Sequence, residues 1–280
     1  MNENLEALKR ARKRIFLTAY RGGKAHLASA FSIVEILYVL YEGHVLKFDP
    51  KNPDWGQRDR LILSKGHGSL ALYDALCTAG YFTEEALNNF CRPGPPLGGE
   101  PNALETPGVE ASTGSLGHGL SIGVGMALAA KKDGINNKIY VILGDGECEE
   151  GSVWEAVMSA AAFKLDNLVA ILDQNRLQKM SSVKEIMGID TWKGRFEAFG
   201  WQVKQSDGHS IPNLYRQLTG PWEPEKPHLL LAETIKGKGI SLMENEPRWH
   251  FKLPNKRELK VFINELGITE EELERCKKHI

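Results

Sequence analysis

The stretch that most constrains the fold runs from residue 138 to residue 177, where two apolar runs flank a helix-like segment. The first run, Ile139 to Leu143, is continuously apolar, as expected of a strand buried on both faces of a parallel sheet. Residues 152–165 are rich in alanine and long enough for a helix, and the second apolar run is Leu168 to Leu172. Strand, helix and strand at these lengths predict a βαβ unit with a right-handed crossover. We therefore expect an α/β fold with a doubly wound, mostly parallel sheet.

Polar side chains follow both predicted strands. Asp145 follows the first within a Gly-Asp-Gly sequence, and Asn175 follows the second. Because parallel strands end at one edge of a sheet, we expect Asp145 and Asn175 to lie together where open α/β sheets bind ligands. Carboxylate and amide oxygens suit Mg²⁺, which also takes phosphate oxygens and water. The pattern predicts a metal-bridged diphosphate, although Gly-Asp-Gly alone is also compatible with an ordinary strand-end turn.

Composition excludes several other classes of protein. A chain of 280 residues with a net charge of −1 and scattered Lys and Arg has no basic face for nucleic acid. Its charged beginning is unlike a signal peptide, and no apolar run approaches the length that spans a membrane. The four cysteines have no metal-ligand spacing and make no dense disulfide framework. These features favour a cytoplasmic protein of one large domain, with no membrane or nucleic-acid partner and a helical tail at about 255–280.

Two histidines lie in glycine-containing turns. His26 lies between two predicted helices, and Ser32 with Glu35 predicts a capping box for the second of them. His67 lies in a Gly-His-Gly turn between a short strand, Arg60 to Leu63, and a helix. The free N–H groups at the start of that helix favour an anion. Taken alone, His26 is more often a structural residue in such a place, and His67 could be an incidental part of a helix-cap turn.

The Gly-Asp-Gly sequence with Asn175 about thirty residues later is similar to the thiamine-diphosphate signature. The wider segment GDGECEEGSVWEA resembles the amino-terminal half of transketolases, and residues 243–250 (MENEPRWH) resemble the split members, whose halves are separate chains. The resemblance extends over nearly the whole chain. It implies that residues 1–280 form a single thiamine-diphosphate-binding domain of the diphosphate-domain type. The implied reaction moves a two-carbon ketol unit from a ketose donor to an aldose acceptor.

The resemblance also implies which residues bind the cofactor and the metal. Mg²⁺, or Ca²⁺ or Mn²⁺ in its place, would be bound by Asp145, Asn175 and the backbone oxygen of Leu177. The residues implied to bind thiamine diphosphate are His67, Gly114, Ser115, Leu116, Gly146, Asn175 and His250.

The catalytic residues implied by the resemblance are His26, His250 and Glu150. The two histidines would orient substrate oxygens and assist proton transfer, since histidine can titrate near neutrality. Glu150 would couple two active sites across an interface. The family pattern is broken at Glu100, where a substrate-contacting histidine is expected, and also at Lys24 and Lys179. The sugar therefore stays open, and phosphorylated, sulfonated and branched ketoses all remain candidates.

The family's site needs a second domain, which carries the glutamate that activates the aminopyrimidine. The chain ends before any such domain, so we expect activity only with a carboxy-terminal partner subunit that bears the pyrimidine domain. The expected assembly contains two copies of each chain. Two alternatives remain open: a non-catalytic assembly subunit, and another thiamine-dependent ketol or 2-oxo acid enzyme.

Overall fold

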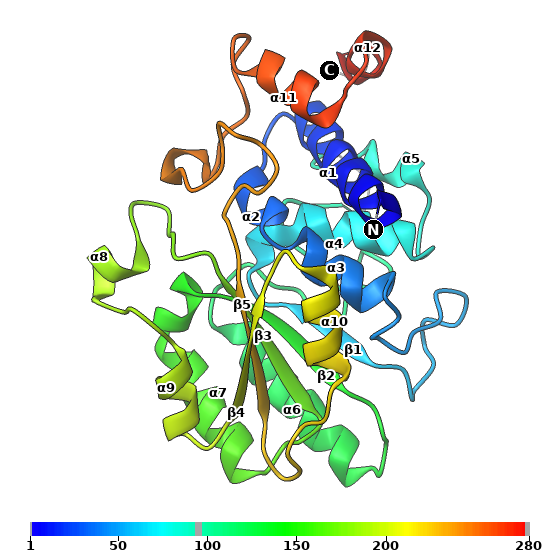
Figure 1. The fold of residues 1–280 in the computed structure, drawn as a ribbon. Helices are drawn as coiled ribbons and strands as arrows, with labels where there is room; N and C mark the ends of the chain where they lie inside the picture. Colours follow the sequence, from blue (N-terminus) through cyan, green and yellow to red (C-terminus); the bar gives the residue numbers. More distant parts are fainter. Residues whose placement is uncertain (1, 93–96, 278–280) are drawn as a thin grey trace.

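A five-stranded, all-parallel sheet forms the centre of the computed structural model, which describes residues 2–92 and 97–277 (Figure 1). The strands lie in the order β1-β2-β3-β5-β4. Their bounds are Arg60–Leu63 for β1, Ile139–Gly144 for β2, Leu168–Gln174 for β3, Gln202–Asp207 for β4 and His228–Glu233 for β5. With helices on both faces of this sheet, the predicted doubly wound α/β class is confirmed.

Two groups of helices pack on the two faces of the sheet (Figure 1). One group comprises α1 (Asn2–Gly22), α2 (Leu27–Phe31), α3 (Val34–Tyr41), α4 (Ser69–Thr78) and α10 (Ile211–Thr219). The other comprises α6 (His118–Lys132), α7 (Gly151–Ala162) and α9 (Lys193–Ala198). The remaining helices are α5 (Glu84–Leu87), α8 (Val183–Met187), α11 (Leu259–Leu266) and α12 (Glu270–Lys277), with short 3₁₀ helices η1 (Gly66–Gly68), η2 (Gly146–Glu149) and η3 (Pro247–Trp249).

The central strands are apolar on both sides because both of their faces are covered. Tyr140 and Ile142 of β2 pack into the apolar cluster formed with α1 to α4 and α10. Val141 and Leu143 pack into the opposite cluster, with α6, α7 and α9. Burial on both faces explains why a continuous apolar run, rather than an alternating one, marks this strand in the sequence.

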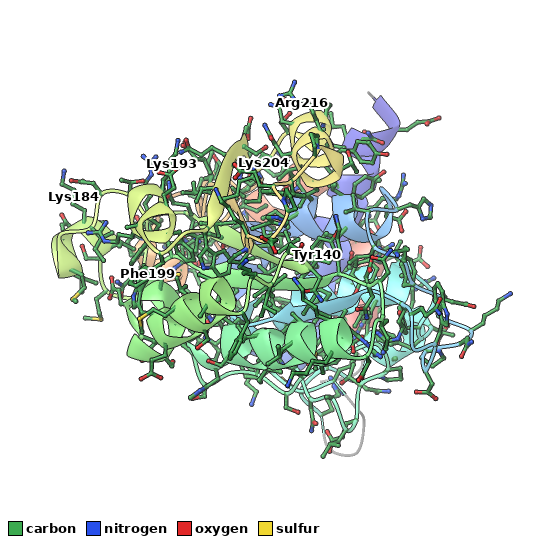
Figure 2. All side chains as sticks on the ribbon, turned by 90° about the horizontal axis from the view of Figure 1, so that it is seen from below. Tyr140, Lys184, Lys193, Phe199, Lys204 and Arg216 are labelled. Carbon is green, nitrogen blue, oxygen red and sulfur yellow. The ribbon has the colours of Figure 1, made fainter. Side chains whose placement is uncertain are left out.

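The edge strand β4 is only partly buried. Its Lys204 Nζ donates to the carbonyl oxygens of Gln217, at 3.0 Å, and Gly220, at 3.3 Å. The ammonium also lies 3.7 Å from the ring centre of Trp222. Figure 2 labels Lys204 beside α10, which carries Arg216. A charged side chain on an outer strand hinders pairing with a strand of another chain.

The predicted βαβ unit is present, because β2 and β3 are parallel neighbours joined through α7. Their register pairs Gly144 with Asp173. Asp145 and Asn175 therefore leave the sheet at the same edge. On its other side β3 pairs with β5, whose last residue, Glu233, lies opposite Gln174. The carboxyl ends of three strands meet here, as in other open α/β sheets that bind ligands at this edge.

The predicted capping box of Ser32 and Glu35 is wrong. Helix α3 begins at Val34, with no side-chain cap. Ser32 Oγ instead donates to Asp173 Oδ2 at 2.7 Å. Glu35 accepts two hydrogen bonds from the Arg12 guanidinium, at 2.7 and 2.8 Å. Both side chains therefore bind buried partners from other elements, which local spacing does not reveal.

The end of the chain packs against its beginning, because α11 and α12 both contact α1 (Figure 1). Phe262 of α11 is buried, with its ring centroid 5.0 Å from that of Phe16 and 5.3 Å from that of Trp249. A capping box precedes α12: Glu272 N donates to Thr269 Oγ1 at 3.2 Å, and Thr269 N donates to Glu272 Oε2 at 2.8 Å. Among residues 2–92 and 97–277, none of the helices combines the length and the apolar character that crossing a membrane requires.

Candidate functional site

Most of the predicted site residues line one cavity of about 260 Å³ at the carboxyl ends of β2 and β3. The cavity is bounded by loops that follow strands and precede helices, which is where parallel sheets place their ligand sites. Its predicted residues are His67, Leu116, Asp145, Gly146, Asn175, Leu177 and His250. Further lining residues are Ser29, Lys65, Gly144, Glu147, Gln178, Lys179 and Lys236. We call this cavity the edge cavity.

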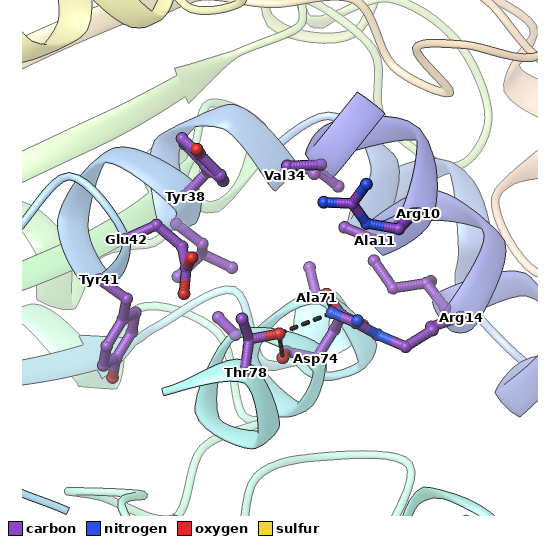
Figure 3. Close-up of a pocket in the computed structure, with 14 residues that line it drawn as sticks. Arg10, Ala11, Arg14, Val34, Tyr38, Tyr41, Glu42, Ala71, Asp74 and Thr78 are labelled. Atoms are coloured by element: carbon purple, nitrogen blue, oxygen red, sulfur yellow. Dashed lines mark hydrogen bonds and ion pairs between the residues drawn. The ribbon is translucent and has the colours of Figure 1, made fainter. Parts of the chain in front are cut away.

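A second, smaller cavity of about 90 Å³ lies among α1, α3 and α4 (Figure 3). Its polar wall includes Arg14, which donates to Asp74 at 2.8 Å and to Thr78 at 2.6 Å. None of the predicted site residues lines it. The guanidinium and carboxylate are already paired with each other, so this cavity offers a ligand no free charge from that pair.

Three histidines from separate turns form a cluster at the edge cavity. His26 precedes α2, His67 lies within η1, and His250 follows η3. The ring centroid of His26 lies 5.7 Å from that of His67 and 5.2 Å from that of His250, and the last two are 5.6 Å apart. The ring of Phe251 lies 4.6 Å from that of His26 and covers it on one side. The structure therefore brings together three histidines that are far apart in the sequence.

All three rings are neutral at neutral pH. Burial lowers the pKa of His26 to about 4, and the positive charges of Lys236 and Lys179 act in the same direction. Burial and Lys236 lower the pKa of His250 to about 3. The pKa of His67 is also held well below its ordinary value, first by burial and then by Lys65. A neutral imidazole can donate one hydrogen bond and accept another, so the cluster can orient polar oxygens in two ways.

Asp145 and Asn175 present side-chain oxygens beside this cluster. Asp145 Oδ1 accepts from Gly146 N at 2.8 Å, and its other oxygen accepts from Arg176 N. Asn175 Nδ2 donates to Asp173 Oδ2 at 2.9 Å, which fixes the amide, and its Oδ1 accepts from Leu177 N at 3.1 Å. These contacts hold both side chains at the sheet edge, as the sequence predicts.

The donor set fits a hard divalent cation. Asp145 is buried, and burial together with the negative charge of Asp173 raises the pKa of Asp145 to about 7. The hydrogen bonds that Asp145 accepts from Arg176 N and Gly146 N act in the opposite direction but do not cancel this rise. A cation beside Asp145 would offset this cost of burying its charge. The described residues contain no group of three or more His, Cys, Asp or Glu side chains arranged to hold a metal. A metal bound here would therefore take further oxygens from the backbone, a phosphate or water, as Mg²⁺ commonly does.

Lys65 lines the edge cavity, and we did not predict it. It is buried, and its ammonium forms an ion pair with Asp173 and donates to Ser29 O at 3.2 Å. Burial alone would raise the pKa of Asp173, but the charge of Lys65 and hydrogen bonds from Lys65 and Thr234 hold it below its ordinary value. Lys65 is two residues before the predicted His67, and its position next to that turn was a signal that could have identified it.

Lys236 is the second residue that sequence reasoning missed. Its Nζ donates to the carbonyl oxygens of Leu177, at 3.1 Å, and Gln178, at 3.2 Å, and lies 3.2 Å from His250 Nδ1. Burial lowers the pKa of Lys236 to about 8, and the charge of Lys65 adds to this effect. Because the neutral ring of His250 accepts at Nδ1, its proton is on Nε2. Lys236 follows β5, so its place after a strand ending at this edge was the available signal.

Glu147, also unpredicted, joins the strand ends to the loop before α6. Its buried carboxylate accepts from Gly117 N at 2.9 Å, from Gly144 N at 3.0 Å and from Ser64 Oγ. Burial raises the pKa of Glu147, although these three hydrogen bonds oppose the effect. The side chain therefore positions the loop over the edge cavity, and it is not itself directed to a ligand.

Four predicted residues do not line the edge cavity. Gly114 has a φ of +138°, which favours glycine, and Ser115 is exposed. Glu150 is exposed at the start of α7, and a Cβ added to Gly117 would lie 2.7 Å from its Cβ. His26 contacts the cluster by its ring, as described above. The structure thus places Gly114 and Ser115 on the loop that ends in Leu116, and Glu150 on the outer surface next to that loop.

The model of the transketolase thiamine diphosphate binding domain matches residues 16–276. The chain belongs to the transketolase family. One subunit of the apulose-4-phosphate transketolase from Phocaeicola vulgatus is 40% identical over 265 residues, which cover 94% of each chain. The 6-deoxy-6-sulfo-D-fructose transketolase subunit SqwG from a Clostridium species is 43% identical over 229 residues, 81% of this chain and 83% of that one.

A solved transketolase from Campylobacter jejuni shows the same fold, with a TM-score of 0.85 and 31% identity. The match covers 97% of this chain but only 45% of that one. The transketolase relatives named as subunits, in contrast, match this chain over most of their own length. The predicted resemblance to the amino-terminal subunit of split transketolases is therefore confirmed, and so is the enzyme class.

Proposed function

We propose that this subunit binds thiamine diphosphate with Mg²⁺ at the edge cavity and supplies the diphosphate half of a two-chain transketolase active site. One observation carries this proposal. In a transketolase chain, the two oxygen ligands Asp145 and Asn175 lie in the same cavity as His67 and His250. Ca²⁺ or Mn²⁺ would serve in place of Mg²⁺, because the same oxygen ligands accept them.

The bound cofactor supplies the carbon chemistry of ketol transfer, while this chain binds, orients and shields. In our proposal Asp145, Asn175 and the backbone oxygen of Leu177 hold the metal. His67 and Gly146 lie within reach of a diphosphate in the cavity. Leu116, with Gly114 and Ser115 before it, lines the side on which the aminopyrimidine would lie.

Lys236 would move when the metal binds, because its ammonium now occupies the carbonyl oxygen of Leu177. His250 is a neutral ring with one N–H, which can donate to an oxygen of the substrate or diphosphate. His26 has no hydrogen bond among the described residues apart from the backbone contact of its carbonyl with Ala30, so its ring nitrogens are free to orient a substrate hydroxyl. These two histidines are our proposed proton-transfer residues.

The proposed partner is a carboxy-terminal subunit with a pyrimidine-binding domain, in an assembly of two copies of each chain. The names of the similar subunits support this, because they describe separate subunits. Glu150 lies exposed beside the cofactor loop, which suits contact with another active site across an interface. We further propose a single domain for residues 1–280, a cytoplasmic location, and a sugar or sugar-phosphate-like substrate.

The metal assignment is tested by replacing Asp145 in the assembled enzyme. Asp145→Ala should abolish Mg²⁺-dependent binding of thiamine diphosphate, since it removes the only carboxylate of the proposed ligand set. Asp145→Asn is the matched variant, because it keeps the size and one oxygen while removing the charge, and it should bind with intermediate affinity. Calorimetric titration measures both, and unchanged affinity in Asp145→Ala would rule out the metal assignment.

The requirement for a partner is tested by assaying the chain alone and together with the pyrimidine-domain subunit. With thiamine diphosphate, Mg²⁺ and a panel of ketose donors and aldose acceptors, we expect ketol transfer only from the pair. Turnover by the isolated chain would contradict the two-chain proposal. Cofactor binding by the pair without ketol transfer would favour a different thiamine-dependent reaction, and no cofactor binding would favour an assembly subunit.

A further inference from the structure

A tight turn after β3 lies beside the edge cavity, and Lys179 is at its tip. Leu177 pairs with Ser182 in an antiparallel bridge, and Gln178 N donates to Ser181 O at 2.8 Å. Lys179 is one of the two residues between the last two positions, and it is exposed while it also lines the edge cavity. Its side chain therefore lies where the cavity opens to solvent.

The turn is anchored at both of its ends. On the side that follows the turn, Val183 N donates to Arg176 O at 3.1 Å. Next to the tip, Gln178 Nε2 donates to the carboxylate of Glu149, in the short helix η2 that follows β2. These bonds connect the turn to two strand ends of the site, so the position of Lys179 at the cavity is set by the fold.

Lys179 differs from the other two lysines of the edge cavity in having a free ammonium group. Lys65 forms an ion pair with Asp173, and Lys236 donates to two carbonyl oxygens. Of the three lysines that line the cavity, only Lys179 makes no hydrogen bond or ion pair with another residue of segments 2–92 and 97–277. A cation at a ligand cavity without a partner of its own favours a negatively charged ligand group.

The charge of Lys179 reaches the two histidines that we propose to face the substrate. Burial is the largest cause of the lowered pKa of His26, and Lys179 adds more to this effect than Lys65 does. Lys179 also contributes, after burial, to the lowered pKa of His250. At His67, the proposed diphosphate contact, Lys65 is the first charge after burial. Lys179 therefore acts on the substrate side of the cavity, whereas Lys65 acts on the diphosphate side.

We propose that Lys179 is a specificity-determining residue whose ammonium group binds an anionic group of the sugar substrate, a phosphate or a sulfonate, on the open side of the edge cavity. A lysine suits this role because its ammonium is a point charge with three donors for anionic oxygens. A neutral sugar gains nothing from this charge, so Lys179 selects substrates by their charge. The inference rests on the proposed ketol-transfer function and narrows its substrate to anionic sugars.

The test uses the assembled two-chain holoenzyme and matched sets of sugars that differ in charge. The donors are D-fructose, D-fructose 6-phosphate and 6-deoxy-6-sulfo-D-fructose in one set, and apulose and apulose 4-phosphate in another. The acceptors are D-glyceraldehyde and its 3-phosphate. Lys179→Met keeps the length of the side chain without its charge, and Lys179→Arg keeps the charge. Lys184→Met is the control, because Lys184 pairs with Asp190 on the surface.

The loss in Lys179→Met should depend on the charge of the sugar. We expect kcat/KM to fall roughly 5- to 50-fold for the phosphorylated or sulfonated sugar, as for a lost bond to a charged group that solvent partly screens. The value for the neutral sugar should not change, Lys179→Arg should keep most of the wild-type value, and Lys184→Met should match the wild type. Added salt should lower kcat/KM for the anionic sugar more in the wild type than in Lys179→Met. Equal losses for charged and neutral sugars, or no loss for either, would overturn the proposal.

Two further readouts separate binding of the substrate from binding of the cofactor and from folding. Affinity for thiamine diphosphate, measured by calorimetry, and the unfolding temperature should be the same in the wild type and Lys179→Met. A loss of cofactor affinity as large as the loss of kcat/KM would make Lys179 a cofactor ligand and overturn the proposal. A wild-type pair that used only neutral sugars would also overturn it. Absence of ketol transfer with every sugar would instead refute the proposed function.

Discussion

His26, His67 and His250 remain uncharged at neutral pH because burial and nearby lysines disfavour their protonated forms. The ammonium groups of Lys65 and Lys236 are already bonded to oxygens of the protein. An anionic diphosphate entering the edge cavity would reverse part of this balance, since a nearby negative charge favours a protonated imidazole. At the scale of single residues, the three histidines are therefore neutral and can become positively charged when an anion binds beside them.

His26 contributes to the pH dependence of stability, as do His67 and His250, whose pKa values are also lowered. The pKa of His26 falls from 6.5 in the ordinary state to about 4 in the fold. Between these values the unfolded chain binds a proton on this ring and the folded chain does not, so the free energy of unfolding decreases as pH falls through this window and is unaffected above it. Urea unfolding of the cofactor-free chain at about pH 7 and about pH 5 measures this effect. Between these two pH values, the free energy of unfolding should fall less in His26→Gln than in the wild type. The exposed control His118→Gln should show the same fall as the wild type.

The two catalytic candidates should separate kinetically. His26→Ala in the assembled enzyme should lower kcat by roughly 10²- to 10⁴-fold, because it removes an orienting or proton-transferring ring, while affinity for thiamine diphosphate barely changes. His250→Ala should also weaken cofactor binding, because its ring lies beside Lys236 and His67 at the proposed diphosphate site. Steady-state kinetics and calorimetry measure both effects. Equal losses of cofactor affinity would show that the two roles are assigned wrongly.

Helix α6 shows how an element is brought close to the sheet by small residues. Gly123 faces β2, where an added Cβ would lie 2.5 Å from Val141 Cγ2 and 3.5 Å from Leu168 Cδ1. Gly125 is exposed, and an added Cβ would meet nothing within 4 Å. The two glycines lie two residues apart in the same helix, yet only one of them is required by packing. Close approach of α6 in turn positions the loop with Leu116 over the edge cavity.

Alanine at these two positions should therefore have opposite effects. Gly123→Ala should lower the free energy of unfolding by about 1–3 kcal/mol, as for a methyl group forced into a packed interface. Gly125→Ala should raise it by about 0.4–1 kcal/mol, because alanine favours the helix and reduces the entropy of the unfolded chain. Urea denaturation of the isolated chain measures both values. Similar effects at the two positions would contradict this account of how α6 packs.

Asp173 connects parts of the molecule that are distant in the sequence. Its carboxylate accepts hydrogen bonds from Ser32 after α2, Lys65 after β1, Asn175 after β3 and Thr234 after β5. The group is fully buried, so its charge depends on these partners. At the scale of the whole molecule, one carboxylate aligns the ends of β1, β3 and β5 and the turn after α2 around the edge cavity.

Asp173→Asn should therefore destabilise the chain strongly. Removing one partner of a buried ion pair leaves the Lys65 ammonium without its counter-charge, which commonly costs about 3–5 kcal/mol. Asp190→Asn is the control, since its ion pair with Lys184 is on the surface and should contribute less than about 1 kcal/mol. The difference between the two free energies of unfolding decides the point. Equal effects would show that Asp173 does not have this central role.

The sequence by itself determined the parts that depend on local pattern. The runs of residues 139–143 and 168–172 predicted β2 and β3, because a strand covered on both faces must be apolar on both faces. Asp145 and Asn175 were then predicted to meet, because neighbouring parallel strands end at the same edge. The resemblance in the same segment indicated the family, which the matches over residues 16–276 confirm.

Only the tertiary structure decided which buried charges are paired. Ser32 was expected to cap a helix, but it binds Asp173, 141 residues away, and Lys65 reaches the same carboxylate across 108 residues. Lys236 reaches Leu177 across 59 residues. The charge of each such group depends on its burial and on neighbours that only chain folding brings together. Sequence spacing does not reveal those neighbours, because the charge of a side chain depends on the burial, charges and hydrogen bonds around it in space.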